Sequence, residues 1–125
     1  MAAKHGLQYN DFEKVFQKYD DQICRGEISP QEFWDKYQDE LLFQDSDINF
    51  LDYWVSKLSI IPETHKLIRD LVHSNISVGL LTNIYSGVFE KSLSIKLIPD
   101  VKYNSVIKSC EIKVIKPEKE IYLLA

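Results

Sequence analysis

The chain has 125 residues, which is about the size of one domain. Apolar residues make up 45% and charged residues 27% of the chain, and with 15 basic and 19 acidic residues the formal net charge is −4. This composition is typical of a globular protein and argues against extensive disorder. Charges of both signs are interspersed along the sequence, so a nucleic-acid surface and a polybasic membrane patch, which need clustered positive charge, are not expected.

The sequence gives two indications of the cellular compartment, at the start of the chain and at its two cysteines. No apolar run in the sequence approaches the length that crosses a bilayer, and residues 1–6 lack the apolar core of a signal peptide. Cys24 and Cys110 lie far apart, so a disulfide framework is not expected, although a single disulfide is compatible with the sequence. We therefore expect a cytoplasmic protein that binds neither nucleic acid nor a membrane.

The first predicted helix covers residues 9–24. Apolar residues recur there three or four positions apart and form one stripe, made up of Phe12, Val15, Phe16, Tyr19 and Ile23. Gly26 is a suitable stop, because glycine readily adopts the left-handed backbone that ends helices. A second helix is predicted after Ser29, because Ser29, Pro30 and Glu32 stand in the order of a capping box with proline in the first turn.

A third helix is predicted after the polar interruption at residues 45–47, with Ser46 or Asp47 as its N-cap. Its inward-facing residues are expected to be Ile48, Leu51, Trp54, Val55 and Leu58. Pro62 opens a fourth predicted helix, which is expected to end near Asn75. We expect the first three helices to pack on one another through their aromatic side chains.

The second half of the sequence predicts strands that alternate with helices. Residues 76–82 form a short apolar run that we expect to be a strand buried on both faces at its end, as in a parallel sheet. A short helix near residues 88–93 and a second strand at 105–109 follow. Pro117 is expected to begin a last helix. This order predicts an α/β fold with parallel strands near 76–82 and 105–109.

Two positions next to these strands can bind an anion. Ligands of open parallel sheets lie beyond the carboxyl ends of the strands, and Thr82 and Asn83 occupy such an end. Their hydroxyl and amide groups can donate hydrogen bonds to an anion. Lys116 precedes Pro117, which favours an extended backbone at Lys116, so the ammonium can project toward the same anion as a fixed charge. Considered singly, an ordinary strand–turn junction and a solvated lysine are the better explanations of these residues.

Considered together, the two segments resemble motifs II and III of the haloacid dehalogenase-like (HAD) hydrolase superfamily. Residues 80–83 read Leu-Leu-Thr-Asn, and residues 109–122 resemble the pattern Ser-x-Glu-x-Gly-x-x-Lys-Pro-x-x-x-Ile-Tyr of the subfamily with a helical cap. The matching positions are Ser109, Glu111, Lys116, Pro117, Ile121 and Tyr122. The sequence departs from the pattern at Lys113, where the family usually has glycine, and at Glu118 and Lys119, where Asp-Pro is usual.

The resemblance extends over nearly the whole chain and implies a domain organisation. Residues 7–59 resemble the cap, and residues 62–82 resemble the helix and strand that return the chain to the core. It therefore implies a helical cap over residues 1–60 and a partial Rossmann-like α/β core over residues 61–125.

The resemblance also implies a magnesium-dependent hydrolase of the phosphatase type that acts on a phosphomonoester. In this family an aspartate at the end of the first strand attacks phosphorus, a second aspartate two residues later protonates the leaving oxygen, and acidic residues of a fourth motif help to hold Mg²⁺. By resemblance, Thr82 and Lys116 are the catalytic residues present in this chain. Thr82, Asn83 and Lys116 would bind the phosphate, with Asn83 also shaping the loop.

The aspartates that would react are not found where the family has them. No Asp-x-Asp precedes the predicted cap, Asp20 and Asp21 lie inside a predicted helix, and the sequence stops before motif IV. We therefore expect a truncated member or fragment that is inactive alone and binds no Mg²⁺ itself. Its partner would be a small phosphorylated molecule or none. An unpaired apolar strand edge at 76–81 is expected to cause self-association or instability, or to be covered by a missing partner segment.

Other readings of the sequence stay open. A non-catalytic binding or interaction protein built on a degenerate HAD-like fold is the main alternative, and an unrelated helical α/β domain is the third. His5, His65 and His73 are too scattered to suggest a metal site. Cys110 has no base placed near it by the sequence, so an inert, partly buried thiol is expected.

Overall fold

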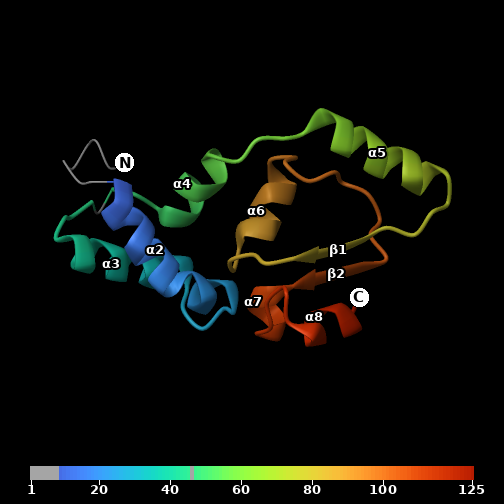
Figure 1. Ribbon diagram of the computed structural model, residues 1–125. Helices are drawn as coiled ribbons and strands as arrows, with labels where there is room; N and C mark the ends of the chain where they lie inside the picture. The colour runs from blue at the N-terminus through green and yellow to red at the C-terminus, as the bar shows by residue number, and fades with distance from the viewer. Residues whose placement is uncertain (1–8, 46) are drawn as a thin grey trace.

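A computed structural model describes residues 9–45 and 47–125 (Figure 1). The predicted residues His5 and Ser46, and the first eight residues of the predicted cap, lie outside the described part. The elements in chain order are α2 (Tyr9–Cys24), α3 (Pro30–Leu41), α4 (Phe50–Ser56), α5 (Pro62–His73), β1 (Gly79–Thr82), α6 (Val88–Ser94), β2 (Ser105–Lys108), α7 (Ser109–Ile112) and α8 (Lys119–Leu123).

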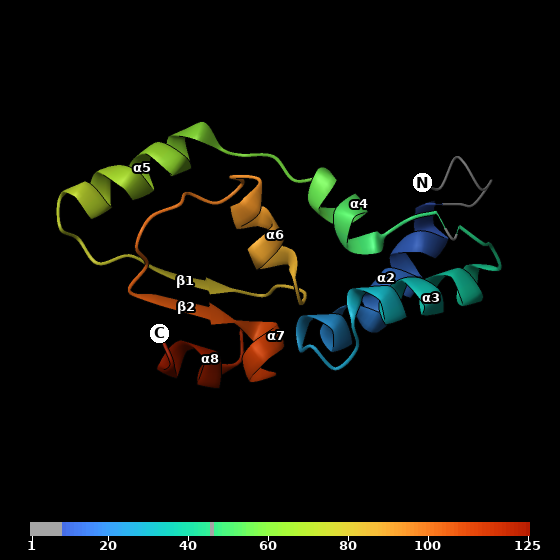
Figure 2. The ribbon, with the colours of Figure 1, turned by 180° about the vertical axis from the view of Figure 1, so that it is seen from behind.

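The helices α2, α3 and α4 lie together at one end of the molecule, and the two strands with α5 to α8 form the other end (Figures 1 and 2). The predicted fold class is confirmed, because a helical N-terminal part is followed by an α/β part with a parallel strand pair. The division into residues 1–60 and 61–125 stays a prediction.

Aromatic side chains make up most of the core of the helical part. Phe33 and Trp34 are each 1% exposed. The rings of Trp34 and Phe50 stack with their centroids 5.6 Å apart, and Phe16 stacks on Trp54 at 5.7 Å. Because aromatic pairs add to the free energy of burial, these contacts hold α2, α3 and α4 together as the sequence predicted.

The start of α3 is formed by the predicted capping box. The Ser29 hydroxyl accepts from the Glu32 amide at 3.1 Å, and the Glu32 carboxylate accepts from the Ser29 amide at 2.7 Å. Two amides that have no partner within the helix are thereby satisfied. These hydrogen bonds fix where the chain turns between α2 and α3.

The predicted start of α4 is wrong by a few residues. Asn49 is the N-cap, since its side-chain oxygen accepts from the Asp52 amide at 3.0 Å. Asp47 lies outside the helix and is exposed. Leu58 was also expected to face inward, but it follows the end of α4 and is 43% exposed. Val55 is buried as predicted, and Phe50 is the other buried residue of α4.

The strands β1 and β2 pair in parallel, with Gly79 opposite Ser105 and Thr82 opposite Lys108. β1 begins later than predicted, because the Ile76 amide bonds the Leu71 carbonyl at the end of α5 rather than a strand. The expectation that β1 is buried on both faces is wrong. Gly79 is exposed and the rest of β1 is half-buried, because β2 is the only strand paired with it among the described residues.

Two boundaries after β2 also differ from the prediction. β2 ends at Lys108, and Ser109, which is fully buried, begins the short helix α7. Pro117 does not begin the last helix, because Glu118 is the N-cap and α8 starts at Lys119. Residues 113–118 therefore form a loop between α7 and α8, and this loop carries Lys116. The Lys116–Pro117 peptide bond is cis.

Candidate anion-binding site

The carboxyl ends of β1 and β2 lie side by side on the side of the sheet nearest the helical part (Figure 1). Thr82 ends β1 and Lys108 ends β2. The loop of residues 113–118 returns to this edge from α7. The topology therefore gathers the predicted site residues at one place, as a parallel sheet requires.

Lys116 reaches the end of β1 with its side chain. Its Nζ donates to the Leu81 carbonyl at 3.2 Å, one residue before Thr82. The Thr82 hydroxyl donates to the Asn83 carbonyl, also at 3.2 Å. Both side chains are half-buried. The ammonium and the hydroxyl thus each bond a backbone carbonyl at the end of β1, at the long end of the range for hydrogen bonds.

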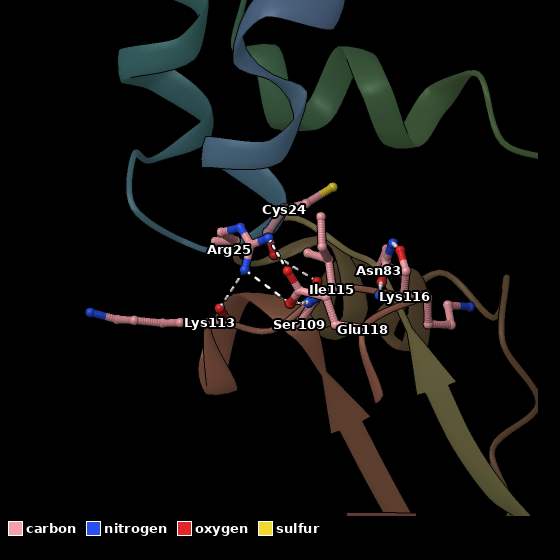
Figure 3. A network of polar contacts seen from close by, with 8 residues as sticks. All are labelled: Cys24, Arg25, Asn83, Ser109, Lys113, Ile115, Lys116 and Glu118. Atoms are coloured by element: carbon pink, nitrogen blue, oxygen red, sulfur yellow. Dashed lines mark hydrogen bonds and ion pairs between the residues drawn. The ribbon is translucent and has the colours of Figure 1, made fainter. Parts of the chain in front are cut away.

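Asn83 holds the backbone of Lys116 with both ends of its amide. Its Oδ1 accepts from the Lys116 amide at 2.7 Å, and its Nδ2 donates to the Lys116 carbonyl at 3.1 Å (Figure 3). The side-chain amide is therefore engaged with the loop. This arrangement fits the loop-shaping role of Asn83, while a direct bond from Asn83 to phosphate stays a prediction.

A second set of contacts holds the same loop from the other side. Arg25, in the link between α2 and α3, donates to the Lys113 carbonyl at 3.0 Å and to the Glu118 carboxylate at 3.1 Å, and its other Nη also pairs with this carboxylate (Figure 3). Glu118 accepts in addition from the Ile115 amide at 3.0 Å. The hydrogen bonds from Arg25 and then from Ile115 lower the pKa of the Glu118 carboxyl.

Ser109 joins three segments below the loop. Its hydroxyl donates to the Cys24 carbonyl at 2.6 Å and accepts from the Ile84 amide at 2.9 Å. The residue is 0% exposed, so these bonds are made away from water, where an unpaired polar group is costly. Ser109 therefore fixes the end of α2 and the loop after β1 on the start of α7.

The charges around the strand ends favour an anion at Lys116 rather than at Lys108. The Lys108 ammonium pairs with Glu90 and with Glu111, each at 2.6 Å. Although burial opposes it, bonding to Glu111 and Glu90 raises the pKa of Lys108. Among the described residues Lys116 has no carboxylate partner within ion-pair distance. Its ammonium bonds the Leu81 carbonyl, a neutral group, so its charge is not offset by a carboxylate of the described residues.

The expectation that this chain binds no Mg²⁺ itself stays a prediction. In residues 9–45 and 47–125 no three His, Cys, Asp or Glu side chains come together in a way that could hold a metal ion. Asp20, which lies within α2, accepts from the Tyr85 hydroxyl at 3.1 Å. His65 bonds the Leu97 carbonyl at 2.8 Å. Thr82, Asn83 and Lys116 therefore lie at the strand end without a cluster of acidic ligands of the kind Mg²⁺ prefers among the described residues, and their binding of an anion stays a prediction.

Cys24 and Cys110 are both free thiols. Burial raises the pKa of Cys24 to about 12, and burial also raises the pKa of Cys110, so both stay protonated at neutral pH.

In the part of the chain that the structure describes, no helix is both long and apolar enough to cross a membrane.

The sequence pointed to Thr82, Asn83 and Lys116 as site residues. In the structure Lys116 contacts Asn83 and the Leu81 carbonyl, next to Thr82, while the role of the three residues in a site stays a prediction. The sequence did not point to Arg25 and Glu118 as partners. Their separation of 93 positions leaves no local signal, although Glu118 stands at a position where the motif has another acidic residue. Ser109 matched the motif but had no role, and its full burial in the structure supplies one.

Neither a scan against models of protein families nor a search of curated proteins found a match. Solved structures of a HAD family enzyme from Bacteroides thetaiotaomicron are similar over 92% of this chain. One has 22% identity and a TM-score of 0.69. A complex with magnesium and inorganic phosphate has 22% identity and a TM-score of 0.65.

A third structure, an aspartate-to-alanine variant of that enzyme with magnesium and inorganic phosphate, has 24% identity and a TM-score of 0.67. At this level of identity the likeness establishes the fold. The chain spans 66% of the length of the first two structures and 65% of the third. The fold of this chain is therefore that of HAD family enzymes, over about two thirds of their length.

Proposed function

We propose that this chain is the phosphate-binding part of a HAD-like hydrolase of the phosphatase type, and that its ligand is a small phosphomonoester. The observation that carries the proposal is the contact of the Lys116 ammonium with the Leu81 carbonyl beside Thr82. A fixed cation and a hydroxyl at the carboxyl end of a parallel strand suit a phosphate group. The fold, shared with an enzyme solved in complex with magnesium and inorganic phosphate, supports this ligand.

The residues present account for binding and charge compensation. In the proposed complex the Lys116 ammonium leaves the Leu81 carbonyl and donates to a phosphate oxygen, where it offsets negative charge. The Thr82 hydroxyl leaves the Asn83 carbonyl and donates to a second oxygen. Asn83 keeps Lys116 in place throughout.

The same chemistry limits what this chain does alone. Phosphoryl transfer to an aspartate needs an attacking carboxylate and a metal ion, because positioning and charge neutralisation supply most of the rate. Neither the Thr82 hydroxyl nor the Lys116 ammonium replaces that carboxylate. We infer that residues 1–125 bind phosphate without hydrolysing its esters, and that Mg²⁺ acts only where the acidic residues of the family are supplied.

Titration of the purified chain with inorganic phosphate tests this proposal. Binding is measured by isothermal titration calorimetry for the wild type, Lys116→Met and Thr82→Val. We expect Lys116→Met to raise Kd by about tenfold or more, since it removes a charge-assisted hydrogen bond. Lys119→Met is the matched control, because Lys119 is an exposed lysine of the neighbouring helix.

Two outcomes contradict the proposal. One is the absence of saturable phosphate binding by the wild type. The other is an equal loss of affinity in Lys116→Met and Lys119→Met, which would indicate diffuse electrostatic attraction rather than a site. Hydrolysis of p-nitrophenyl phosphate with Mg²⁺ is measured in parallel, and turnover that disappears in Lys116→Met would overturn the inference that the chain is inactive.

A second candidate function is an interaction with another protein chain through β1. A cavity of about 290 Å³ lies beside β1 and includes Ile61, Ile68, Leu80, Leu81 and Phe89 in its lining. Because β1 is half-exposed and paired only with β2 among the described residues, its outer edge can accept another strand. We propose that a second copy of the chain binds there, and this non-catalytic role does not exclude phosphate binding.

A further inference from the structure

The loop that carries Lys116 is held by the helical part of the molecule as well as by the strands. Arg25 lies between α2 and α3, outside the α/β part, yet it bonds the loop at both ends. It donates to the Lys113 carbonyl at 3.0 Å and to the Glu118 carboxylate at 3.1 Å. Glu118 in turn accepts from the Ile115 amide in the middle of the loop at 3.0 Å. Lys116 itself is thus bracketed by residues that Arg25 fixes directly or through Glu118.

We propose that Arg25, acting through Glu118, is a positioning residue that keeps the Lys116 ammonium at the carboxyl end of β1. The affinity of the site for an anion then depends on how the helical part packs against the α/β part. The proposal rests on the proposed anion site at Thr82 and Lys116. It adds a dependence of that site on a residue that does not touch the anion.

The chemistry of the pair explains why arginine suits this place. A guanidinium presents several N–H donors in one plane, so it can bond a carboxylate with two of its nitrogens and still donate to a carbonyl. Arg25 does this, with Glu118 and the Lys113 carbonyl as acceptors (Figure 3). A lysine has one nitrogen and cannot keep this planar arrangement. The carboxylate of Glu118 would then be free to turn away from the Ile115 amide.

The backbone on both sides of Arg25 is also held against α7. On one side of it, the Cys24 carbonyl accepts from the buried Ser109 hydroxyl at 2.6 Å. On the other side, a Cβ on Gly26 would come within 2.3 Å of the Cys110 carbonyl oxygen, so the chain passes directly against α7. Arg25 therefore extends from a backbone held at both neighbours. A guanidinium held in this way can transmit the position of the α2–α3 link to the loop.

An ion pair that only stabilises the contact between the two ends of the molecule would not affect the anion site in particular. Lys91 of α6 pairs with Asp52 of α4 at 2.9 Å and so also joins the two ends of the molecule, but it does not contact residues 113–118. If Arg25 only stabilises the contact between the two ends, loss of the Lys91 pair should have the same consequences. If Arg25 positions Lys116, only Arg25 and Glu118 should affect the anion site.

The experiment compares Arg25→Lys, Glu118→Gln and the control Lys91→Gln with the wild type. The side-chain resonances of Lys116 are observed by NMR on ¹³C,¹⁵N-lysine-labelled protein, assigned with Lys116→Met, and inorganic phosphate is then titrated. We expect Arg25→Lys and Glu118→Gln to shift the Lys116 resonances before phosphate is added and to raise Kd for phosphate about tenfold. Lys91→Gln should do neither.

The double variant Arg25→Lys, Glu118→Gln gives a readout that a general loss of stability would not produce. If the two residues act as one unit, its Kd should match that of the single variants rather than the product of their effects. Unshifted Lys116 resonances in both single variants, or equal effects of Lys91→Gln, would overturn the proposal. If Arg25→Lys does not fold, Glu118→Gln decides alone. If the wild type binds no phosphate, the proposed function fails, while the Lys116 resonances still decide the positioning.

Discussion

Asn83 and Ser109 each use one small side chain to join segments that are distant in the sequence. Asn83 bonds the amide and the carbonyl of Lys116 across 33 positions. Ser109 bonds the Cys24 carbonyl across 85 positions and the Ile84 amide across 25. Because both side chains are short, they make these hydrogen bonds only when the joined segments keep one relative position. The backbone of Lys116 is therefore held by its two hydrogen bonds with Asn83 as well as by packing.

A side chain at Gly26 should destabilise the fold. The φ of Gly26 is +65° and an added Cβ would lie 2.3 Å from the backbone oxygen of Cys110. Gly26→Ala should lower the free energy of unfolding by about 2–4 kcal/mol, because left-handed strain adds to a clash with backbone. Urea denaturation measures this.

Gly79→Ala is the matched control for Gly26→Ala. A Cβ there would clash with the Ser105 side-chain oxygen, at 2.5 Å, which can rotate away, while the nearest backbone atom, the Ser105 oxygen, lies at an ordinary contact distance of 3.5 Å. We expect the smaller loss of stability for Gly79→Ala. Equal losses in the two variants would contradict the close approach of the α2–α3 link to α7.

Glu118 predicts a pH dependence of stability. The bonds from Arg25 and Ile115 hold its pKa below the ordinary value of 4.5, so the folded state binds its proton more weakly than the unfolded state. The contribution of the charged form is therefore complete above the unfolded-state pKa and is lost as pH falls through the folded-state pKa. The difference in unfolding free energy between wild type and Glu118→Gln should be largest near pH 7 and should narrow on acidification below pH 4.5.

Urea melts of the two proteins between pH 7 and pH 3 test this, because the other carboxylates titrate alike in both and cancel. A difference that stays constant over this range would show that the carboxylate charge of Glu118 has no part in the contact with Arg25.

At the scale of elements, the sequence predicted those helices and strands whose signals are local. The stripe of apolar residues gave α2 its observed bounds, Tyr9–Cys24, and the capping box placed the start of α3. The parallel pairing of β1 and β2 followed from alternating strand and helix patterns. Boundaries that depend on a choice among several polar residues, such as the start of α4, were not resolved by the pattern.

The start of α4 gives a prediction at this scale. Asn49→Ala removes the bond to the Asp52 amide and should cost about 1 kcal/mol of stability, as N-cap replacements do. Asp47→Ala, at the residue that the sequence suggested as the cap, should change the unfolding free energy much less. Chemical denaturation of both variants measures the difference, and a larger loss for Asp47→Ala would place the cap where the sequence had predicted it.

At the scale of the whole molecule, the candidate site could be predicted only in part. Thr82 and Lys116 were found because motif and topology both bring strand ends together. The contacts of Arg25 with Lys113 and Glu118 were not, because they join the helical end to the last loop across 88 and 93 positions. Such contacts depend on how the two ends pack, and a single sequence carries no local pattern for that.

The edge of β1 gives the prediction for the whole molecule. Sedimentation velocity over a range of concentrations should show association of the wild type if a second copy binds beside β1. Ile61→Lys places a charge at the lining of the cavity next to β1 and should weaken association. Leu67→Lys is the control, because Leu67 is similarly exposed, at 57% against 62% for Ile61, but does not line the cavity. A chain that stays monomeric at all concentrations would contradict this role.

The long reach of the contacts around Lys116 has a consequence for how the molecule folds. The Arg25–Glu118 pair closes a loop of 93 positions and the Ser109–Cys24 bond closes one of 85, whereas the helices α2 and α3 form through neighbours. Closing long loops costs entropy that short ones do not, so distant pairings form slowly. Competence to bind phosphate should therefore arise among the last events of refolding, after the helical signal has returned, and a phosphate-sensitive probe would time the joining of the two ends.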